Sequence, residues 1–205
     1  MSDRPDEVGG VVDANEPVRV RGFGAGLVVL GVIGLLAAFT LTVDKFRLLE
    51  DPTYTPSCNL NPVLSCGSVM VTEQASAFGF PNPLLGLIGF SVVVTIGVVL
   101  ATGTRLPHGI MVGLAVGAAA GLAFVHWLAF QSLYRIDALC PWCMVVWAVT
   151  IPIAVWSVLV ALRLRGSHRL VEGLWSVRYL IVLFWYLVIL VLILVRFWDY
   201  WSTQL

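Results

Sequence analysis

Five long runs without a formal charge constrain this 205-residue chain more than any other feature. Lys, Arg, Asp and Glu are absent from residues 22–43, 74–104, 106–134, 138–162 and 179–195. An α-helix rises about 1.5 Å per residue, so about 20 mostly apolar residues are enough to cross a bilayer. A β-barrel is disfavoured, because barrel strands alternate polar and apolar residues over short segments and these runs do not. The sequence therefore predicts an all-α polytopic membrane protein with spans near residues 22–43, 84–103, 109–132, 141–162 and 178–197.

The charge content fits a chain that is dissolved in a bilayer. Only 12% of the residues are charged, whereas an average soluble domain carries roughly 25%. The 12 basic and 12 acidic residues cancel, which excludes a basic nucleic-acid-binding protein. Residues 1–21 differ from the rest, since they are polar and contain two prolines, and we interpret them as a disordered cytoplasmic tail.

The distribution of Lys and Arg predicts the orientation in the membrane. With the N-terminus inside, the inner segments hold eight basic residues and the outer segments hold four, so we expect the N-terminus inside and the C-terminus outside. The inner residues are Arg4, Arg19, Arg21, Arg105, Arg163, Arg165, Arg169 and Arg178, and the outer ones are Lys45, Arg47, Arg135 and Arg196.

The one long loop, residues 44–83, faces outward in this orientation. It begins with charged residues, contains several prolines, and includes a segment at 65–78 that could form a short helix lying on the membrane. In the third span, Gly113, Gly117 and Gly121 recur every four residues, which indicates a face where a neighbouring helix packs closely. His126 in the same span is interpreted as a packed or interhelical hydrogen-bonding residue.

The chain has four cysteines, and all of them lie on the predicted outer side. Cys58 and Cys66 are spaced C-x7-C in the long loop, and Cys140 and Cys143 form C-P-W-C where the fourth span begins. Pro141 is suited to the first position of a helix, which would make Cys140 the N-cap residue. The positive end of the helix dipole favours a thiolate there, as in redox-active C-x-x-C motifs.

Two other interpretations of the cysteines are open. Two structural disulfides would suit Cys58–Cys66, but the two-residue spacer of Cys140–Cys143 closes too short a loop to constrain the unfolded chain much. A four-cysteine zinc site normally has short spacers in both halves, and the C-x7-C pair breaks that pattern. We therefore favour redox chemistry and expect no metal. Two pairs on one face suggest a relay, in which thiol–disulfide exchange moves two electrons toward a membrane-dissolved acceptor, most simply a quinone.

At these cysteines the sequence resembles the bacterial branch of the vitamin K epoxide reductase family. The resembling motifs are PSCNLNPVLSCGSV at 56–69, FPNPLLG at 80–86 and CPWC at 140–143, in the family's order and spacing. The resemblance covers about residues 20–165. It implies a four-transmembrane-helix bundle around a quinone pocket, capped by the loop helix, with a fifth transmembrane helix outside this core. The expected divisions are the tail 1–21, the catalytic bundle 22–165 with loop 44–83, and the fifth helix with a short outer tail at 166–205.

The resemblance also implies roles for individual residues. Cys58 and Cys66 correspond to the shuttle pair that exchanges electrons with a thioredoxin-like protein, and Cys140 and Cys143 to the active-site pair beside the quinone. Cys140 is expected to meet a loop cysteine, with Cys66 preferred. Three further residues are expected at the quinone: Asn82, matching an asparagine that hydrogen-bonds a carbonyl; Thr72, where relatives carry a serine; and Trp147, where vertebrate members carry a tyrosine.

The expected function is that of a quinone-dependent thiol–disulfide oxidoreductase in the bacterial cytoplasmic membrane. It would reoxidise a separate DsbA-like or thioredoxin-like partner on the outer face and reduce a quinone of the menaquinone or ubiquinone type. The alternatives are a quinone epoxide reductase and a non-enzymatic scaffold with two structural disulfides. A DsbB-type enzyme would place its C-x-x-C in the first outer loop, which is the reverse of the order here.

Overall fold

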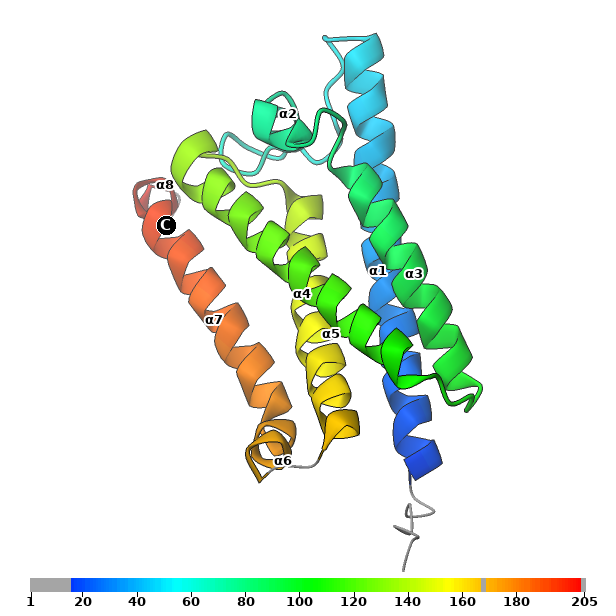
Figure 1. The fold of residues 1–205 in the computed structure, drawn as a ribbon. Coiled ribbons are helices and arrows are strands. Elements are labelled where there is room, and N and C mark those ends of the chain that lie inside the picture. The colour runs from blue at the N-terminus through cyan, green and yellow to red at the C-terminus, as the bar shows by residue number, and fades with distance from the viewer. Residues whose placement is uncertain (1–15, 167–168, 204–205) are drawn as a thin grey trace, which may run out of the picture.

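The structure, a computed structural model, describes residues 16–166 and 169–203 (Figure 1). Among these residues, five helices are long and apolar enough to cross a membrane, as the charge-free runs predict. An all-α polytopic membrane protein is thereby confirmed. The five helices are α1 (Glu16–Glu50), α3 (Pro83–Ala101), α4 (His108–Gln131), α5 (Pro141–Arg165) and α7 (Arg178–Arg196).

Short helices close the two ends of this bundle. At one end lie α2 (Cys66–Met70), the 3₁₀-helix η1 (Glu73–Ser76), the π-helical turn η2 (Ser132–Ile136) and α8 (Trp198–Ser202). At the other end, α6 (Arg169–Ser176) connects α5 to α7 (Figure 1). The predicted loop helix at 65–78 is thus present as two separate pieces, α2 and η1, because the backbone leaves helical geometry at Thr72.

The first helix is longer than predicted at both ends. Residues 1–15 of the predicted tail lie outside the described residues, but residues 16–21 belong to α1 instead of a disordered tail. A proline is tolerated in a first helical turn, because the first N–H groups have no acceptor within the helix. At the other end α1 continues through the charged residues 44–50, since charge ends a bilayer crossing without ending a helix.

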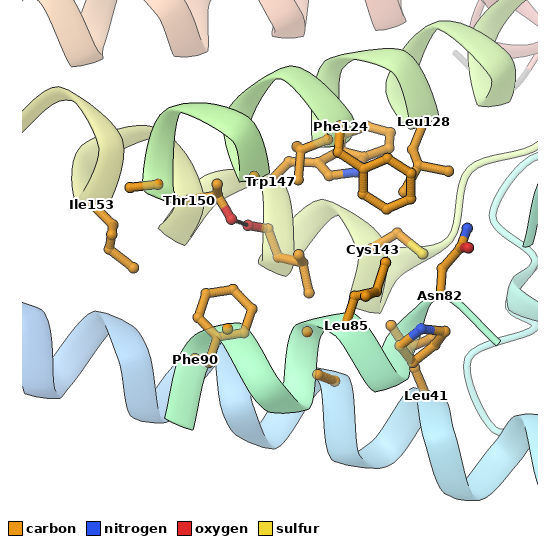
Figure 2. A pocket seen from close by; sticks show the side chains of 18 of the residues that line it. Leu41, Asn82, Leu85, Phe90, Phe124, Leu128, Cys143, Trp147, Thr150 and Ile153 are labelled. Carbon is orange, nitrogen blue, oxygen red and sulfur yellow. Dashed lines mark hydrogen bonds between the residues drawn. The ribbon is translucent and has the colours of Figure 1, made fainter. Parts of the chain in front are cut away.

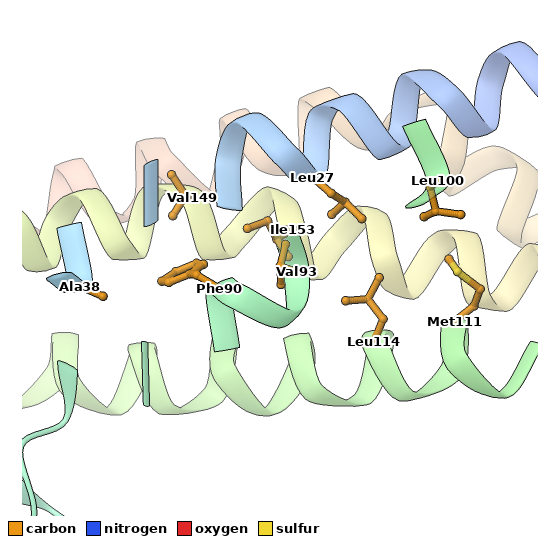
Figure 3. Packing of buried hydrophobic residues seen from close by; sticks show 9 residues of the cluster. All are labelled: Leu27, Ala38, Phe90, Val93, Leu100, Met111, Leu114, Val149 and Ile153. Atoms are coloured by element: carbon orange, nitrogen blue, oxygen red, sulfur yellow. The ribbon is translucent and has the colours of Figure 1, made fainter. Parts of the chain in front are cut away.

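The core is built from α1, α3, α4 and α5, whose buried side chains interdigitate (Figure 3). Its members are Leu27, Ala38, Phe90, Val93, Leu100, Met111, Leu114, Val149 and Ile153. The backbones of α1 and α3 approach closely: a Cβ atom added at Gly24 would lie 2.5 Å from the backbone nitrogen of Ala101. Glycine is therefore required for this contact, because no side chain can yield there.

The glycine repeat of α4 has a different role from the predicted one. A Cβ atom added at Gly113, Gly117 or Gly121 would have no heavy atom within 4 Å, so no helix among residues 16–166 and 169–203 packs closely on this face. Instead, all three glycines line a cavity. The spacing correctly places them on one face of the helix, but it does not determine what lies opposite that face.

The fifth spanning helix, α7, is tied to the bundle by polar contacts. The indole Nε1 of Trp185 donates to His126 Nε2 at 2.8 Å, which confirms His126 as an interhelical hydrogen-bonding residue. Tyr186 donates its hydroxyl to the carbonyl of Ala148, and Arg196 pairs with Asp137. These contacts hold α7 beside α4 and α5, outside the core formed by the first four spans (Figure 1).

Candidate functional site

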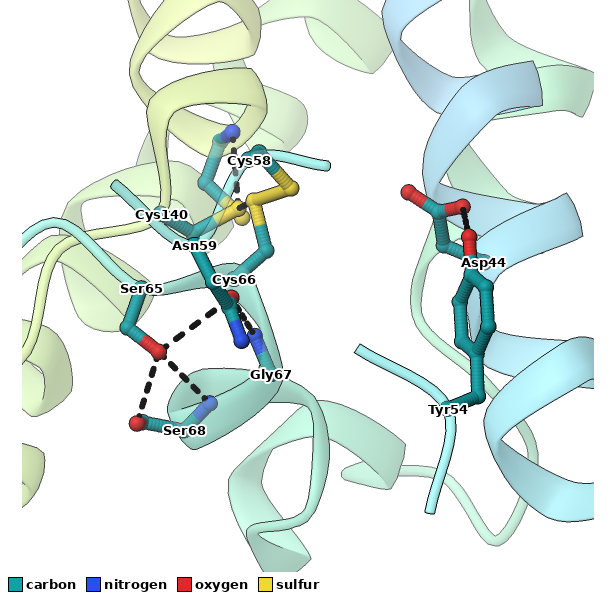
Figure 4. The surroundings of a disulfide bond; sticks show 10 residues. Asp44, Tyr54, Cys58, Asn59, Ser65, Cys66, Gly67, Ser68 and Cys140 are labelled. Atoms are coloured by element: carbon teal, nitrogen blue, oxygen red, sulfur yellow. Dashed lines mark hydrogen bonds between the residues drawn. A yellow bond between two sulfur atoms is a disulfide. The ribbon is translucent and has the colours of Figure 1, made fainter. Parts of the chain in front are cut away.

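Three of the four cysteines lie together at the end of the bundle that α2 covers (Figure 4). Cys58 and Cys66 form a disulfide, and Cys140 and Cys143 are free thiols. The Sγ atom of Cys140 lies 3.3 Å from the Sγ atom of Cys66. Cys66 therefore has a bonded sulfur on one side and a free thiol within reach on the other, the starting arrangement of thiol–disulfide exchange.

A pair of backbone hydrogen bonds brings these distant parts of the chain together. The N–H of Ser65 donates to the carbonyl of Leu139 at 2.8 Å, and the N–H of Leu139 donates to the carbonyl of Val63 at 2.7 Å. The result is one parallel bridge between Leu64 and Leu139. Because Cys140 directly follows the bridge and Cys66 follows two residues after Leu64, the bridge sets the approach of their sulfur atoms.

The loop that carries the disulfide is shaped by two asparagines. Asn59 Oδ1 accepts from the N–H of Gly67 at 2.8 Å, and Asn61 Oδ1 accepts from the N–H groups of Val63 and Leu64. Ser65 is the N-cap of α2 and accepts from the N–H of Ser68. Each bond satisfies a backbone donor that the turn or the helix start leaves unpaired.

The local geometry of C-P-W-C matches the sequence prediction. Cys140 is the N-cap of α5, and Pro141 occupies the first turn. The Cys140 sulfur accepts from the backbone N–H of Cys143 at 3.3 Å. The Cys140 sulfur therefore lies at the positive end of the α5 dipole, in contact with a backbone donor of the first helical turn.

A cavity of about 650 Å³ opens beside Cys143, between α1, α3, α4 and α5 (Figure 2). Its lining is mostly aliphatic and aromatic, and Cys143 and Asn82 lie at the same end of it (Figure 2). Polar side chains are a minority of the lining and include Lys45, Thr72 and Asn82. Volume, apolar walls and a small convergent polar set are typical of sites for apolar ring compounds, so these residues fit a quinone.

The three non-cysteine residues expected at the quinone all line this cavity. Asn82 is buried and is also tied to the loop: its Nδ2 donates to the carbonyl of Gln74 at 2.7 Å, and its Oδ1 accepts from the N–H of Ala77. Thr72 donates its hydroxyl to the carbonyl of Val69. Trp147 is buried in a cluster that also contains Val125 of α4 and Ile193 of α7. The amide of Asn82 carries a second N–H that these bonds do not use.

A second hollow lies on the loop side of the disulfide. Cys58 contributes to it together with Ser57, Leu60, Trp142 and Val145. Leu60 is 66% exposed, so an apolar side chain projects at the rim. Cys58 therefore borders this outer hollow, whereas Cys143 borders the inner cavity, and Cys66 and Cys140 lie between them.

Two residues of this site were not singled out from the sequence. Asn59 shapes the disulfide loop, and its only sequence signal is its place in the N-L-N segment between the two loop cysteines. Lys45 lines the cavity, although its charge suggested a loop beyond the span. The sequence feature that could have identified Lys45 is its spacing from Leu41, a core residue four positions earlier on the same helical face.

Comparison with protein-family models finds a match over residues 26–158 to the model described as the vitamin K epoxide reductase family. The matched segment contains α3, α4, both cysteine pairs and most of α1 and α5, and it ends before α7. A search of curated protein sequences gave no match.

Proposed function

The chain belongs to the vitamin K epoxide reductase family, and on this premise we propose that it reoxidises a DsbA-like or thioredoxin-like protein at the expense of quinone. The family consists of membrane oxidoreductases that use a quinone as electron partner. In this proposal, electrons pass from the partner to Cys58/Cys66, then to Cys140/Cys143, and then to the quinone. The outcome is disulfide formation in exported proteins.

The observation that carries the proposal is the continuous sequence of sulfur atoms from the outer hollow to the cavity. Cys58 borders the hollow and is disulfide-bonded to Cys66. The Sγ atom of Cys140 lies 3.3 Å from that of Cys66, and Cys143 lines the cavity. A scaffold with two structural disulfides has no need of a free thiol beside a disulfide. The opposite order of cysteines argues against a DsbB-type relationship.

The exchange begins at the loop pair. A thiolate of the reduced partner attacks Cys58, a new partner–Cys58 disulfide forms, and Cys66 leaves as a thiolate. The partner's second thiol then displaces Cys58 and leaves both loop cysteines reduced, with one disulfide now in the partner. The apolar rim at Leu60 and Trp142 offers a contact surface for the partner's backbone at this step.

The second exchange carries the electrons inward. Cys66 attacks the Cys140–Cys143 disulfide at Cys140, and Cys143 leaves as a thiolate facing the cavity. Cys58 then attacks Cys66, the loop disulfide forms again, and Cys140 leaves as a thiolate accepting the Cys143 N–H. The observed arrangement, with a loop disulfide and a reduced C-x-x-C pair, corresponds to the product of this step.

The last transfer takes place at the cavity. The Cys140 and Cys143 thiolates first take up the two protons given up by the partner's two thiols. When they then join in a disulfide, two electrons and these two protons are released. A bound quinone accepts the two electrons and the two protons and is reduced to the quinol. Asn82 is positioned to orient the ring through its second amide N–H, and Trp147 and the apolar walls exclude water.

The test is a reconstituted assay with purified protein, a menaquinone analogue and a reduced DsbA protein. We expect quinone-dependent oxidation of DsbA that is abolished by Cys140→Ala and by Cys143→Ala. Cys58→Ala and Cys66→Ala should abolish it with DsbA as donor but retain activity with a small dithiol that reaches the inner pair directly. Full activity of Cys143→Ala with any donor would exclude the proposed route.

A further inference from the structure

Lys45 is a basic residue buried inside the bundle. It lies in α1 and is only 9% exposed, and its side chain lines the same cavity as Cys143 and Asn82. Leu41, one helical turn earlier, packs in the cluster that contains Cys66 and Cys140 (Figure 2 shows Leu41 at the end where Cys143 and Asn82 lie). Lys45 is therefore at the sulfur end of the cavity.

The hydrogen bonding of Lys45 leaves part of its capacity unused. Its Nζ donates to the carbonyl of Met70 at 2.6 Å. Among residues 16–166 and 169–203, no carboxylate oxygen lies within salt-bridge distance of it, whereas Arg163 and Arg196 each have a carboxylate partner. An ammonium group has three N–H donors, and a buried cation is costly unless it is paired. An anionic or strongly accepting ligand in the cavity would offset that cost.

We propose that Lys45 binds an oxygen of the quinone and stabilises the negative charge that this oxygen gains during reduction. The inference rests on the proposed function and adds to it a residue outside the cysteine and asparagine motifs. No additional reactant is needed, because Cys140 and Cys143 supply both electrons and both protons as their disulfide forms. Lys45 only donates a hydrogen bond and is unchanged at the end of the reaction.

A purely structural role would be to anchor α2 through the carbonyl of Met70. The two roles differ in their expected effect on ligand binding. An anchor affects every ligand of the cavity equally, whereas a cation that faces the ligand favours an anionic quinone over a neutral one of the same size. Charge preference in binding therefore separates the roles without relying on turnover.

The experiment compares binding of two naphthoquinones by quenching of tryptophan fluorescence. The neutral probe is 2-methyl-1,4-naphthoquinone, and the anionic probe is 2-hydroxy-1,4-naphthoquinone, whose hydroxyl is ionised at neutral pH. All four cysteines are replaced by serine so that neither probe reacts with a thiol. Lys45→Met removes the charge, Lys45→Arg retains it, and Arg47→Met removes an exposed charge of the same helix as a matched control.

We expect Lys45→Met to lower affinity for the anionic probe by about tenfold or more and affinity for the neutral probe by much less. Lys45→Arg and Arg47→Met should keep the preference for the anion. An equal loss for both probes, or an unchanged preference in Lys45→Met, overturns the role of Lys45 alone. Failure of the unsubstituted full chain to reduce quinone in the reconstituted assay overturns the proposed function itself.

Discussion

Cys66 is the residue on which both halves of the sulfur relay depend. It is fully buried, bonded to Cys58 and 3.3 Å from the sulfur of Cys140. Exchange requires the attacking sulfur to reach one particular sulfur of a disulfide, and here only Cys66 of the loop pair has that contact with the C-x-x-C motif. This contact can be tested by asking which loop cysteine forms a disulfide with Cys140.

A trapping experiment follows from this contact. In the Cys58→Ser/Cys143→Ser double variant, only Cys66 and Cys140 remain, and we expect them to form a disulfide on mild oxidation. In the matched Cys66→Ser/Cys143→Ser variant, the remaining Cys58 and Cys140 should stay reduced. Peptide mapping under non-reducing conditions distinguishes them, and efficient Cys58–Cys140 crosslinking would contradict the assigned contact.

Asn82 combines a structural and a proposed binding role. Its bonds to Gln74 and Ala77 tie η1 to the start of α3, and its remaining N–H is proposed to bind a quinone carbonyl. We predict that Asn82→Ala lowers kcat/KM for quinone about ten- to a hundredfold, since a hydrogen bond to a charged acceptor contributes roughly 1.5–3 kcal/mol.

Asn82→Asp should be more damaging, because the carboxylate cannot donate to Gln74 and adds negative charge where the quinone oxygen gains it. The control measurement is the rate at which reduced DsbA opens the Cys58–Cys66 disulfide, which should change little in either variant. Unchanged steady-state kinetics with quinone would leave Asn82 only its contacts with the loop.

At the scale of helices, glycines have opposite roles in two places. Gly24 permits α1 and α3 to approach until their backbones touch, whereas Gly117 of α4 faces the open cavity. We predict that Gly24→Ala destabilises the fold by about 1–3 kcal/mol through overpacking. With about 2–4 °C of Tm per kcal/mol for a chain of this size, thermal unfolding in detergent should reveal the loss.

Gly117→Ala is the matched control for this prediction, since the added methyl group meets nothing within 4 Å. Its Tm should be equal or slightly raised, because alanine is the better helix former. Equal effects of the two substitutions would mean that α1 and α3 do not depend on close backbone contact.

The same elements explain which features the sequence could predict. The spans are predictable because a bilayer demands a minimum length of apolar helix, and His126 and the Cys140 cap are predictable because each rests on local spacing. The bridge between Leu64 and Leu139 consists of two backbone hydrogen bonds between segments 75 residues apart in the sequence. Such a contact produces no residue pattern in either segment. Lys45 is not predictable in this way, because a charge near a span end normally indicates the start of a loop, whereas α1 continues through it to Glu50.

At the scale of the whole molecule, the two ends of the bundle are chemically different. The end with α2 carries the cysteines, the outer hollow and the mouth of the cavity, whereas the basic residues Arg163, Arg169 and Arg178 gather around α6 at the other end (Figure 1). Arg163 is paired with Glu172, and it and Arg178 stack on the ring of Trp175. Clustered basic residues are typical of the cytoplasmic side of a membrane.

We therefore predict that the sulfur end faces outward in the cytoplasmic membrane of a bacterium. Disulfide formation requires this orientation, because cytosolic reductants would keep the loop pair reduced. In a background with all four cysteines replaced by serine, Ser202→Cys in α8 and Ser176→Cys in α6 place one exposed thiol at each end. A membrane-impermeant maleimide applied to intact cells should label the first variant at once and the second only after the membrane is permeabilised. The reverse pattern would place the cysteines in the reducing compartment, where a disulfide-forming role could not operate.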